Sequence, residues 1–213
     1  MTSANPTRVL IALVAVIFVA QLLNKGLQQL RPPPPPVIFS AGASLTDPRA
    51  PSLGPADADV IIMLFSDYAC PLCRAMHPDL RKLVATDRRV RIVYRDWPIL
   101  GPRSVRAARL AIASQAQGRH AAFDDELMRR GGPLDDASLR AAAICAGVEW
   151  NRLEQDAKRL SATTDDILGT SSSVARGAGF SGTPTLIIGP YLVEGRISYE
   201  RMRALVAMAR GEP

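Results

Sequence analysis

The stretch Val60-Ile61-Ile62-Met63-Leu64-Phe65-Ser66-Asp67-Tyr68-Ala69-Cys70-Pro71-Leu72-Cys73 decides the fold class of this 213-residue chain. Its first six residues form a short apolar run, partly β-branched and bounded by polar residues, which is typical of a buried strand. Pro71 suits the first position of a helix, because the backbone N–H that proline lacks would be unpaired there. The stretch therefore predicts a strand that turns into a helix, with two cysteines at the start of the helix.

The placement of the two cysteines indicates redox chemistry. At the start of a helix, unpaired backbone N–H groups and the helix dipole favour a thiolate at Cys70. Cys73 lies one turn later on the same side of the helix, where it can close a disulfide with Cys70. We therefore predict that Cys70 is the outer, attacking sulfur and Cys73 the inner, resolving one.

A zinc site is the alternative use of a Cys-x-x-Cys pair. Structural zinc usually needs a second pair of cysteine or histidine ligands. The remaining candidates are Cys145, His77 and His120, and none of them forms a matching pair. We therefore expect no bound metal, and a dithiol needs no other cofactor.

The composition restricts the remaining possibilities. The chain is 47% hydrophobic and 22% charged, with a net charge of +6, which suits one good-sized domain with accessory segments. Its basic residues are spread among acidic ones and few aromatic residues lie between them, unlike the concentrated basic patch of a nucleic-acid interface. Nucleic acid is therefore not an expected partner.

The N-terminal residues 1–30 contain an apolar run at 9–23, interrupted only by Gln21. Fifteen helical residues span about 22 Å, and the residues up to Leu27 bring the length close to the ~30 Å of a bilayer core. We predict an uncleaved membrane anchor, with a cleaved signal peptide as the alternative. With the N-terminus inside, either one places the rest of the chain outside the cytoplasm, in a compartment where disulfides persist.

Residues 31–56 have the composition of a linker. Five consecutive prolines at 32–36 favour a stiff polyproline spacer, and small and polar residues follow. Within this segment, Val37-Ile38-Phe39 is the one stretch that could instead add an edge strand to the following domain.

From Asp57 onward the pattern alternates between strands and helices. The predicted strands are 60–65, 90–94, 185–188 and 191–193. The predicted helices are 70–86, 103–117, 120–130, 135–147, 150–160, 164–178 and 199–209. The order strand, helix, strand, helical block, two strands, helix predicts an α/β fold.

Three motifs carry a family resemblance: Phe65-Ser66-Asp67-Tyr68-Ala69-Cys70-Pro71-Leu72-Cys73, Tyr94-Arg95-Asp96-Trp97-Pro98 and Gly182-Thr183-Pro184-Thr185. They resemble the DsbA-like thiol–disulfide oxidoreductases, members of the thioredoxin superfamily that carry an inserted helical domain. The resemblance covers about residues 57–210. It implies a domain at 57–213, with a thioredoxin part at 57–101 and 177–213 and a helical insertion at 102–176.

The same resemblance implies a function and its partners. Thr183-Pro184 would be a cis peptide beside the dithiol, whose backbone pairs with an extended substrate segment. The partners would be unfolded or extended proteins that carry thiols or disulfides, together with a membrane redox partner. We thus expect a thiol–disulfide oxidoreductase of the bacterial cell envelope, anchored in the inner membrane with its catalytic domain in the periplasm. Oxidation, reduction and isomerisation remain open.

Two positions depart from the family pattern. Strongly oxidising members carry His where this chain has Leu72, so we expect a less oxidising disulfide. Many relatives bury an acid where this chain has Leu64. Asp67, three residues before Cys70, is our candidate for part of that proton handling, with a turn or capping residue as the alternative.

Two further side chains have alternative interpretations. His77 lies on the helical face of Cys73 and could bind copper or zinc with the thiols, which would make the protein a non-enzymatic metal-binding module. We favour a partly exposed helix residue. Cys145 lies in an Ala-rich segment, and we expect a small thiol packed in a helix core.

Overall fold

The computed structural model describes residues 13, 15–21, 37–38 and 47–212. Residues 1–35 and 36–213 form separate units. In the first unit, residues 13 and 15–21 are helical. Among the residues described, no helix combines the length and the apolar character needed to cross a bilayer. Most of the anchor predicted at 1–30, and the linker at 31–36 and 39–46, lie outside the described residues.

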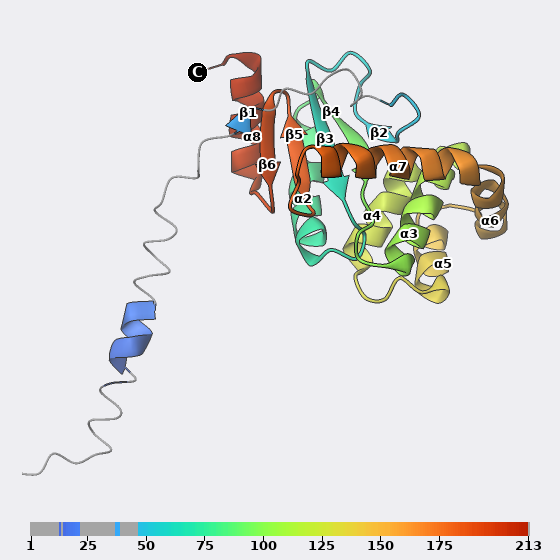
Figure 1. Cartoon of the computed structure of the whole chain (residues 1–213), viewed down its shortest axis with the longest axis horizontal. Helices are drawn as coiled ribbons and strands as arrows, with labels where there is room; N and C mark the ends of the chain where they lie inside the picture. Colours follow the sequence, from blue (N-terminus) through green and yellow to red (C-terminus); the bar gives the residue numbers. More distant parts are fainter. Residues whose placement is uncertain (1–12, 14, 22–36, 39–46, 213) are drawn as a thin grey trace, which may run out of the picture. The chain divides into compact units, whose positions relative to one another are not determined.

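The second unit is built on a mixed sheet of six strands in the order β1-β6-β5-β3-β4-β2 (Figure 1). The central β3 (Val60–Ser66) runs parallel to β4 (Val90–Asp96) and antiparallel to β5 (Thr185–Ile188), which pairs in turn with β6 (Tyr191–Glu194). All residues of β3 and β4 are buried or half-buried, which explains the near-continuous apolar sequence of β3.

Two helices cover one face of this sheet. α2 (Pro71–Thr86) and α8 (Tyr199–Arg210) pack on the strands through one apolar cluster. Its buried members are Val60, Ile62, Leu64, Met76, Leu80, Leu83, Val90, Ile92, Tyr94, Leu186, Ile188, Met202, Leu205 and Val206. Every second residue of β3 and β4 belongs to it, as the alternation of side chains along a strand requires.

A helical block lies between β4 and β5 in the sequence. It comprises α3 (Pro102–Ala113), the 3-10 helix η2 (Ser114–Gln117), α4 (His120–Arg130), α5 (Asp136–Cys145), α6 (Trp150–Arg159) and α7 (Ser161–Gly177). Figure 1 shows α3, α4, α5 and α6 grouped to one side of the sheet. The buried core of this block includes Tyr68, Cys70 and Cys73. The start of α2 therefore lies where the block meets the sheet.

The sequence predicted these elements to within a few residues, with two differences at the N-terminal side. Residues 50 and 51 are buried, and β2 (Ser52–Leu53) pairs antiparallel with β4, so packed structure begins before Asp57. The alternative of an edge strand at Val37-Ile38 is confirmed, because β1 (Val37–Ile38) pairs antiparallel with β6.

Candidate active site

Cys70 is the N-cap of α2. Its backbone is extended, with φ −74° and ψ 119°, and Pro71 follows as the first helical residue. The Cys70 Sγ accepts a hydrogen bond from the backbone N–H of Cys73 at 3.4 Å. This geometry confirms the predicted helix start and places the sulfur against one of the otherwise unpaired N–H groups of the first turn.

The Thr183-Pro184 peptide is cis, as the family resemblance implied, and it lies beside Cys70. Strand pairing explains the proximity of segments so distant in sequence. β3 and β5 are antiparallel, with Phe65 opposite Thr185, so the turn after β3 and the loop before β5 meet at one end of the sheet. The Cys70 thiol donates to the carbonyl oxygen of Thr183 at 3.2 Å.

Both thiols are free and buried, Cys70 with 5% of its surface exposed and Cys73 with 2%. The sulfur of Cys70, predicted to be the outer one, is therefore not exposed to solvent, because Cys70 and Cys73 both pack into the core of the helical block and the Cys70 thiol also bonds Thr183. Burial raises the pKa of the Cys73 thiol, while a hydrogen bond donated by the Asp67 backbone opposes the rise. A thiolate on Cys73 is thus costly in this reduced state.

Asp67 is buried and ties the cysteine turn to the helical block. Its carboxylate accepts hydrogen bonds from the backbone N–H of Ala69 at 2.7 Å, from the backbone N–H of Leu100 at 2.9 Å and from Ser104 Oγ at 2.6 Å. These contacts fit the turn and capping role that the sequence left open. Proton handling by Asp67 stays a prediction.

Exposed apolar side chains flank this turn. Leu72 lies between the two cysteines and is 51% exposed, and Ile99 and Leu100 are exposed on the segment that Asp67 holds. Leu72 lies at helical spacing from Met76 and Leu80, which are buried. In the first turn of α2, however, Cys73 takes the inward position, and Leu72 points out.

His77 is buried and does not reach the solvent as a partly exposed residue would. Its Nε2 lies 2.5 Å from Asp125 Oδ1, and its Nδ1 lies 3.8 Å from Asp124 Oδ2. Both ring nitrogens therefore face carboxylates of α4. Within residues 47–212 and the shorter described segments, no group of three or more His, Cys, Asp or Glu side chains is placed to hold a metal ion.

Cys145 is exposed, so the predicted burial of this thiol is wrong. The buried face of α5 (Asp136–Cys145) is formed by Leu139, Ala142 and Ala143, and Ala146 just after the helix continues it. This helical spacing leaves position 145 on the opposite, exposed face. Arg130 Nη2 donates to the Cys145 sulfur at 2.8 Å.

The sequence analysis missed a set of buried polar residues behind the cysteine turn. Tyr68, Asp96 and Asp124 are each almost fully buried, and the Tyr68 hydroxyl donates to Asp124 Oδ1 at 3.2 Å. One signal was available for Asp96. It continues the inward series Val90, Ile92 and Tyr94 of β4, so a charged residue occupies a position where the pattern places an apolar one.

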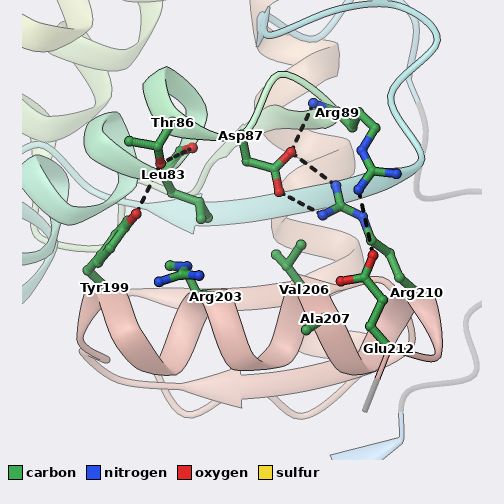
Figure 2. Close-up of a pocket in the computed structure, with 10 residues that line it drawn as sticks. All are labelled: Leu83, Thr86, Asp87, Arg89, Tyr199, Arg203, Val206, Ala207, Arg210 and Glu212. Atoms are coloured by element: carbon green, nitrogen blue, oxygen red, sulfur yellow. Dashed lines mark hydrogen bonds and ion pairs between the residues drawn. The ribbon is translucent and has the colours of Figure 1, made fainter.

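A hollow of about 340 Å³ lies at the C-terminal end of α2, away from the cysteines (Figure 2). Thr86, the last residue of α2, bonds the Tyr199 hydroxyl there, and Arg210 pairs with Asp87 at 2.7 Å. Sixteen helical residues separate this hollow from Cys70, about 24 Å along the helix axis. It takes no part in the chemistry of the dithiol.

Comparisons with known proteins agree with this geometry. The family model described as Thioredoxin matches residues 46–207. A thioredoxin-like oxidoreductase from Silicibacter pomeroyi DSS-3 is 34% identical, with a TM-score of 0.76, over 82% of this chain and 100% of that one. The thiol-disulfide exchange protein alpha-DsbA2 from Wolbachia pipientis is 27% identical, with a TM-score of 0.74, over 78% of this chain and 89% of that one. A periplasmic thioredoxin-like protein from Salmonella enterica serovar Typhimurium is 26% identical, with a TM-score of 0.70, over 80% of this chain and 95% of that one.

Curated relatives include Na(+)/H(+) antiporters. The antiporter NhaA 1 of Salinispora arenicola is 27% identical over 161 residues, which cover 73% of this chain and 24% of the antiporter. The chain thus spans about a quarter of the length of the curated relatives it matches. From the match over residues 46–207, the chain belongs to the thioredoxin family, and its fold is similar to those of solved thiol–disulfide oxidoreductases of the DsbA type.

Proposed function

We propose that this protein exchanges disulfides with extended segments of protein substrates through Cys70 and Cys73, outside the cytoplasm and tethered to the membrane by its N-terminal segment. One observation carries the proposal. The Cys70 sulfur lies at the start of α2 and against the Thr183 carbonyl, next to a cis proline. A helix N-terminus stabilises a thiolate, and an open peptide edge beside it suits an extended partner.

The exchange proceeds in two steps. A substrate thiolate attacks the Cys70 sulfur of the oxidised protein, the Cys70–Cys73 bond breaks, and Cys73 leaves with the electron pair and takes up a proton. A second substrate thiolate then attacks the substrate sulfur bound to Cys70, and Cys70 leaves as a thiolate. The substrate has lost two electrons and gained a disulfide, and the protein holds two reduced sulfurs. A membrane redox partner would restore the oxidised form, and the same steps in reverse would reduce a substrate.

Thr183 and Pro184 are the proposed substrate-binding residues. In the free protein the Cys70 thiol occupies the Thr183 carbonyl. A backbone N–H of a bound segment would replace it there, which would free the Cys70 sulfur for reaction. The exposed side chains of Leu72, Ile99 and Leu100 would offer apolar contacts to the residues beside the substrate cysteine.

Trapping tests the roles of the cysteines. With Cys73→Ser, the mixed disulfide on Cys70 cannot be resolved from within, so covalent complexes with thiol proteins should accumulate and dissolve on reduction. Cys70→Ser should give no complexes and no insulin reduction, and Cys145→Ser should behave as the unsubstituted protein. Absence of complexes with Cys73→Ser contradicts the proposal. The metal-binding alternative would be favoured if the unsubstituted protein bound metal stoichiometrically and the Cys73→Ser and His77→Ala variants did not.

Fractionation tests the location. The periplasmic relative from Salmonella and the apolar run at residues 9–23 support an extracytoplasmic tether. The full-length chain should stay in the membrane pellet after an alkaline carbonate wash, and protease added to spheroplasts should digest it. A chain that resists the protease in intact spheroplasts lies in the cytoplasm and overturns this part of the proposal.

A further inference from the structure

A larger hollow, of about 550 Å³, lies between α2 and α4. α2 contributes Arg74, His77 and Arg81 to its wall, and α4 contributes Asp125 and Arg129. Pockets that bind organic ligands have volumes of this order, whereas a single ion needs far less space. The hollow is therefore large enough to take side chains of a bound partner.

This hollow lies on the face of α2 that begins at Cys70. Arg74, His77 and Arg81 follow Cys70 by four, seven and eleven residues, and this spacing keeps positions on one side of a helix. Arg74 is thus about 6 Å further along the helix axis than Cys70, and Arg81 about 16 Å. An extended chain rises about 3.3 Å per residue, so a segment whose cysteine is at Cys70 reaches the hollow within about two to five residues.

Arg74 brings to this wall a positive charge that no carboxylate of the described residues neutralises. Its Nη2 donates to the carbonyl oxygen of Gly132 at 3.3 Å, which is a neutral acceptor. Its Nε is buried and has no hydrogen-bond partner among the same residues. An unpaired buried donor costs free energy, and a carboxylate bound by the guanidinium would recover it. The planar fork of a guanidinium matches the two oxygens of a carboxylate.

Positive charge also exceeds negative charge around the hollow. Arg81 pairs with Asp125 at 3.1 Å. Arg129 and Arg130 share one carboxylate, that of Glu126, at 2.6 Å and 3.0 Å. With the unpaired guanidinium of the first turn of α2, four guanidinium groups face two carboxylates at this surface of the described chain. The hollow therefore attracts negatively charged groups.

The remaining lining of the hollow is apolar. Pro78 on α2 and Met128 on α4 contribute to it, and the flexible Met128 side chain can adapt to the shape of a partner. A free phosphate or another small anion would gain nothing from these contacts. A peptide segment that carries an acidic side chain next to an apolar one would use both the guanidinium groups and the apolar surface.

We propose that this hollow is an accessory binding site for an acidic segment of the protein partners, in which the carboxylate of a Glu or Asp about two to five residues from the reacting cysteine binds Arg74. The inference rests on the exchange activity proposed above and adds a preference among its partners. Segments with acidic residues near the cysteine are held beside Cys70, and segments with basic residues there are repelled.

Peptides with a scanned acidic position measure this preference. Each peptide carries one cysteine and a single Glu, which is moved through the five residues on either side of the cysteine, and a matched set carries Gln. The rate constant for the mixed disulfide between peptide and oxidised protein is followed by acid quenching and mass spectrometry. It should be about tenfold higher for Glu than for Gln at one or two positions, as expected of one charge-assisted hydrogen bond. The advantage should shrink in about 1 M salt.

Substitutions of Arg74 test whether this residue is the cause. Arg74→Gln should abolish the advantage of Glu over Gln, and Arg74→Lys, which keeps the charge but not the planar fork, should retain part of it. Arg88→Gln is the matched control, because Arg88 is exposed just beyond the far end of α2 and its loss changes the net charge equally. The advantage should be complete in Arg88→Gln. An equal advantage in Arg74→Gln and Arg88→Gln overturns the inference and leaves the exchange activity in place.

A binding measurement separates the hollow from the exchange activity. A peptide with Ser in place of the cysteine and Glu at about two to five residues on either side is added to the unsubstituted protein, and NMR follows the Nε–H of Arg74 and the methyl group of Met128. Both signals should shift, and the Gln peptide should leave them in place. Shifts here in a protein that exchanges no disulfides would remove the exchange activity alone. Unshifted signals, or equal shifts with inorganic phosphate or glutathione, overturn the inference.

Discussion

Leu72, between the two cysteines, is the position at which we expect the sequence to influence the redox potential of the dithiol. It is exposed beside Cys70 and brings no charge that would stabilise a thiolate. Leu72→His should therefore make the couple more oxidising, by at least about 30 mV, which is a tenfold change in the exchange equilibrium. The equilibrium of Cys70 and Cys73 with glutathione measures the shift. Ile144→His, an exposed position on α5, should leave the equilibrium where it was.

Asp67 contributes stability through its three hydrogen-bond donors. Asp67→Ala would leave the N–H groups of Ala69 and Leu100 and the hydroxyl of Ser104 without their acceptor in a buried place. The free energy of unfolding in urea should fall by about 3 kcal/mol. Asp57→Ala, at an exposed position, should change it by less than about 0.5 kcal/mol. Equal values for the two variants would mean that the Asp67 contacts add little.

The residues of the site differ in how far a sequence reveals them. Cys70, Pro71 and Cys73 can be identified from the sequence alone, because a strand followed by a capped helix start is a local pattern. Thr183 was found only through the family resemblance, since its contact with Cys70 depends on the pairing of β3 and β5. No local sequence pattern identifies Asp124 as part of the site. It belongs there because it contacts Tyr68 and His77, which lie in other parts of the chain.

At the scale of elements, the packing of β2 shows whether the segment before Asp57 belongs to the folded domain. Gly54 follows β2 at φ +108°, and a Cβ added there would run into the carbonyl oxygen of Val90 on β4. Gly54→Ala should therefore lower the free energy of unfolding by about 2 kcal/mol. Gly169→Ala, inside α7 with open space around it, should instead raise it by about 0.5 to 1 kcal/mol. A Gly54→Ala protein as stable as the parent would mean that this segment is only a linker.

The helices were predictable from sequence and the edge strand β2 was not. Helix spacing, glycine breaks and caps are local, and Asp135 and Ser198 cap α5 and α8 by accepting N–H bonds from the first turn. β2 is two residues long and has no periodicity to detect. It exists because Ser52 and Leu53 pair with Val93 and Ile92, and such pairing is a property of the folded sheet.

Across the whole second unit, the dithiol lies where the two main cores adjoin. Cys70 and Cys73 pack in the core of the helical block, whereas Met76, one turn further along α2, packs in the core of the sheet. α2 therefore belongs to both parts. A change in how the block packs on α2 acts directly on the surroundings of Cys73, which links the stability of the block to the chemistry of the site.

Buried His120 on α4 makes the stability of the whole unit sensitive to acid. Neither ring nitrogen has a hydrogen-bond partner among the described residues, and burial lowers the pKa of His120 to about 3. The unfolded chain takes up this proton below about pH 6.5, and the folded chain does not until about pH 3. The stability that neutral His120 contributes is therefore present above pH 6.5 and is lost as the pH falls toward 3.

The titration of Asp124 has the opposite effect on stability to that of His120. Its pKa in the folded chain, about 6, lies above the ordinary 3.8, so it stabilises the folded state as the pH falls through 6. His120→Phe keeps an aromatic ring against Tyr94 and removes only the histidine titration. Between pH 7 and pH 5 the unsubstituted protein should lose about 2 kcal/mol relative to this variant, since the Asp124 contribution is common to both and cancels. Urea unfolding of both proteins at the two pH values measures the difference. An equal loss of unfolding free energy in the two proteins would mean that His120 takes up its proton in the folded chain. That would require the contact between α4 and β4 to open.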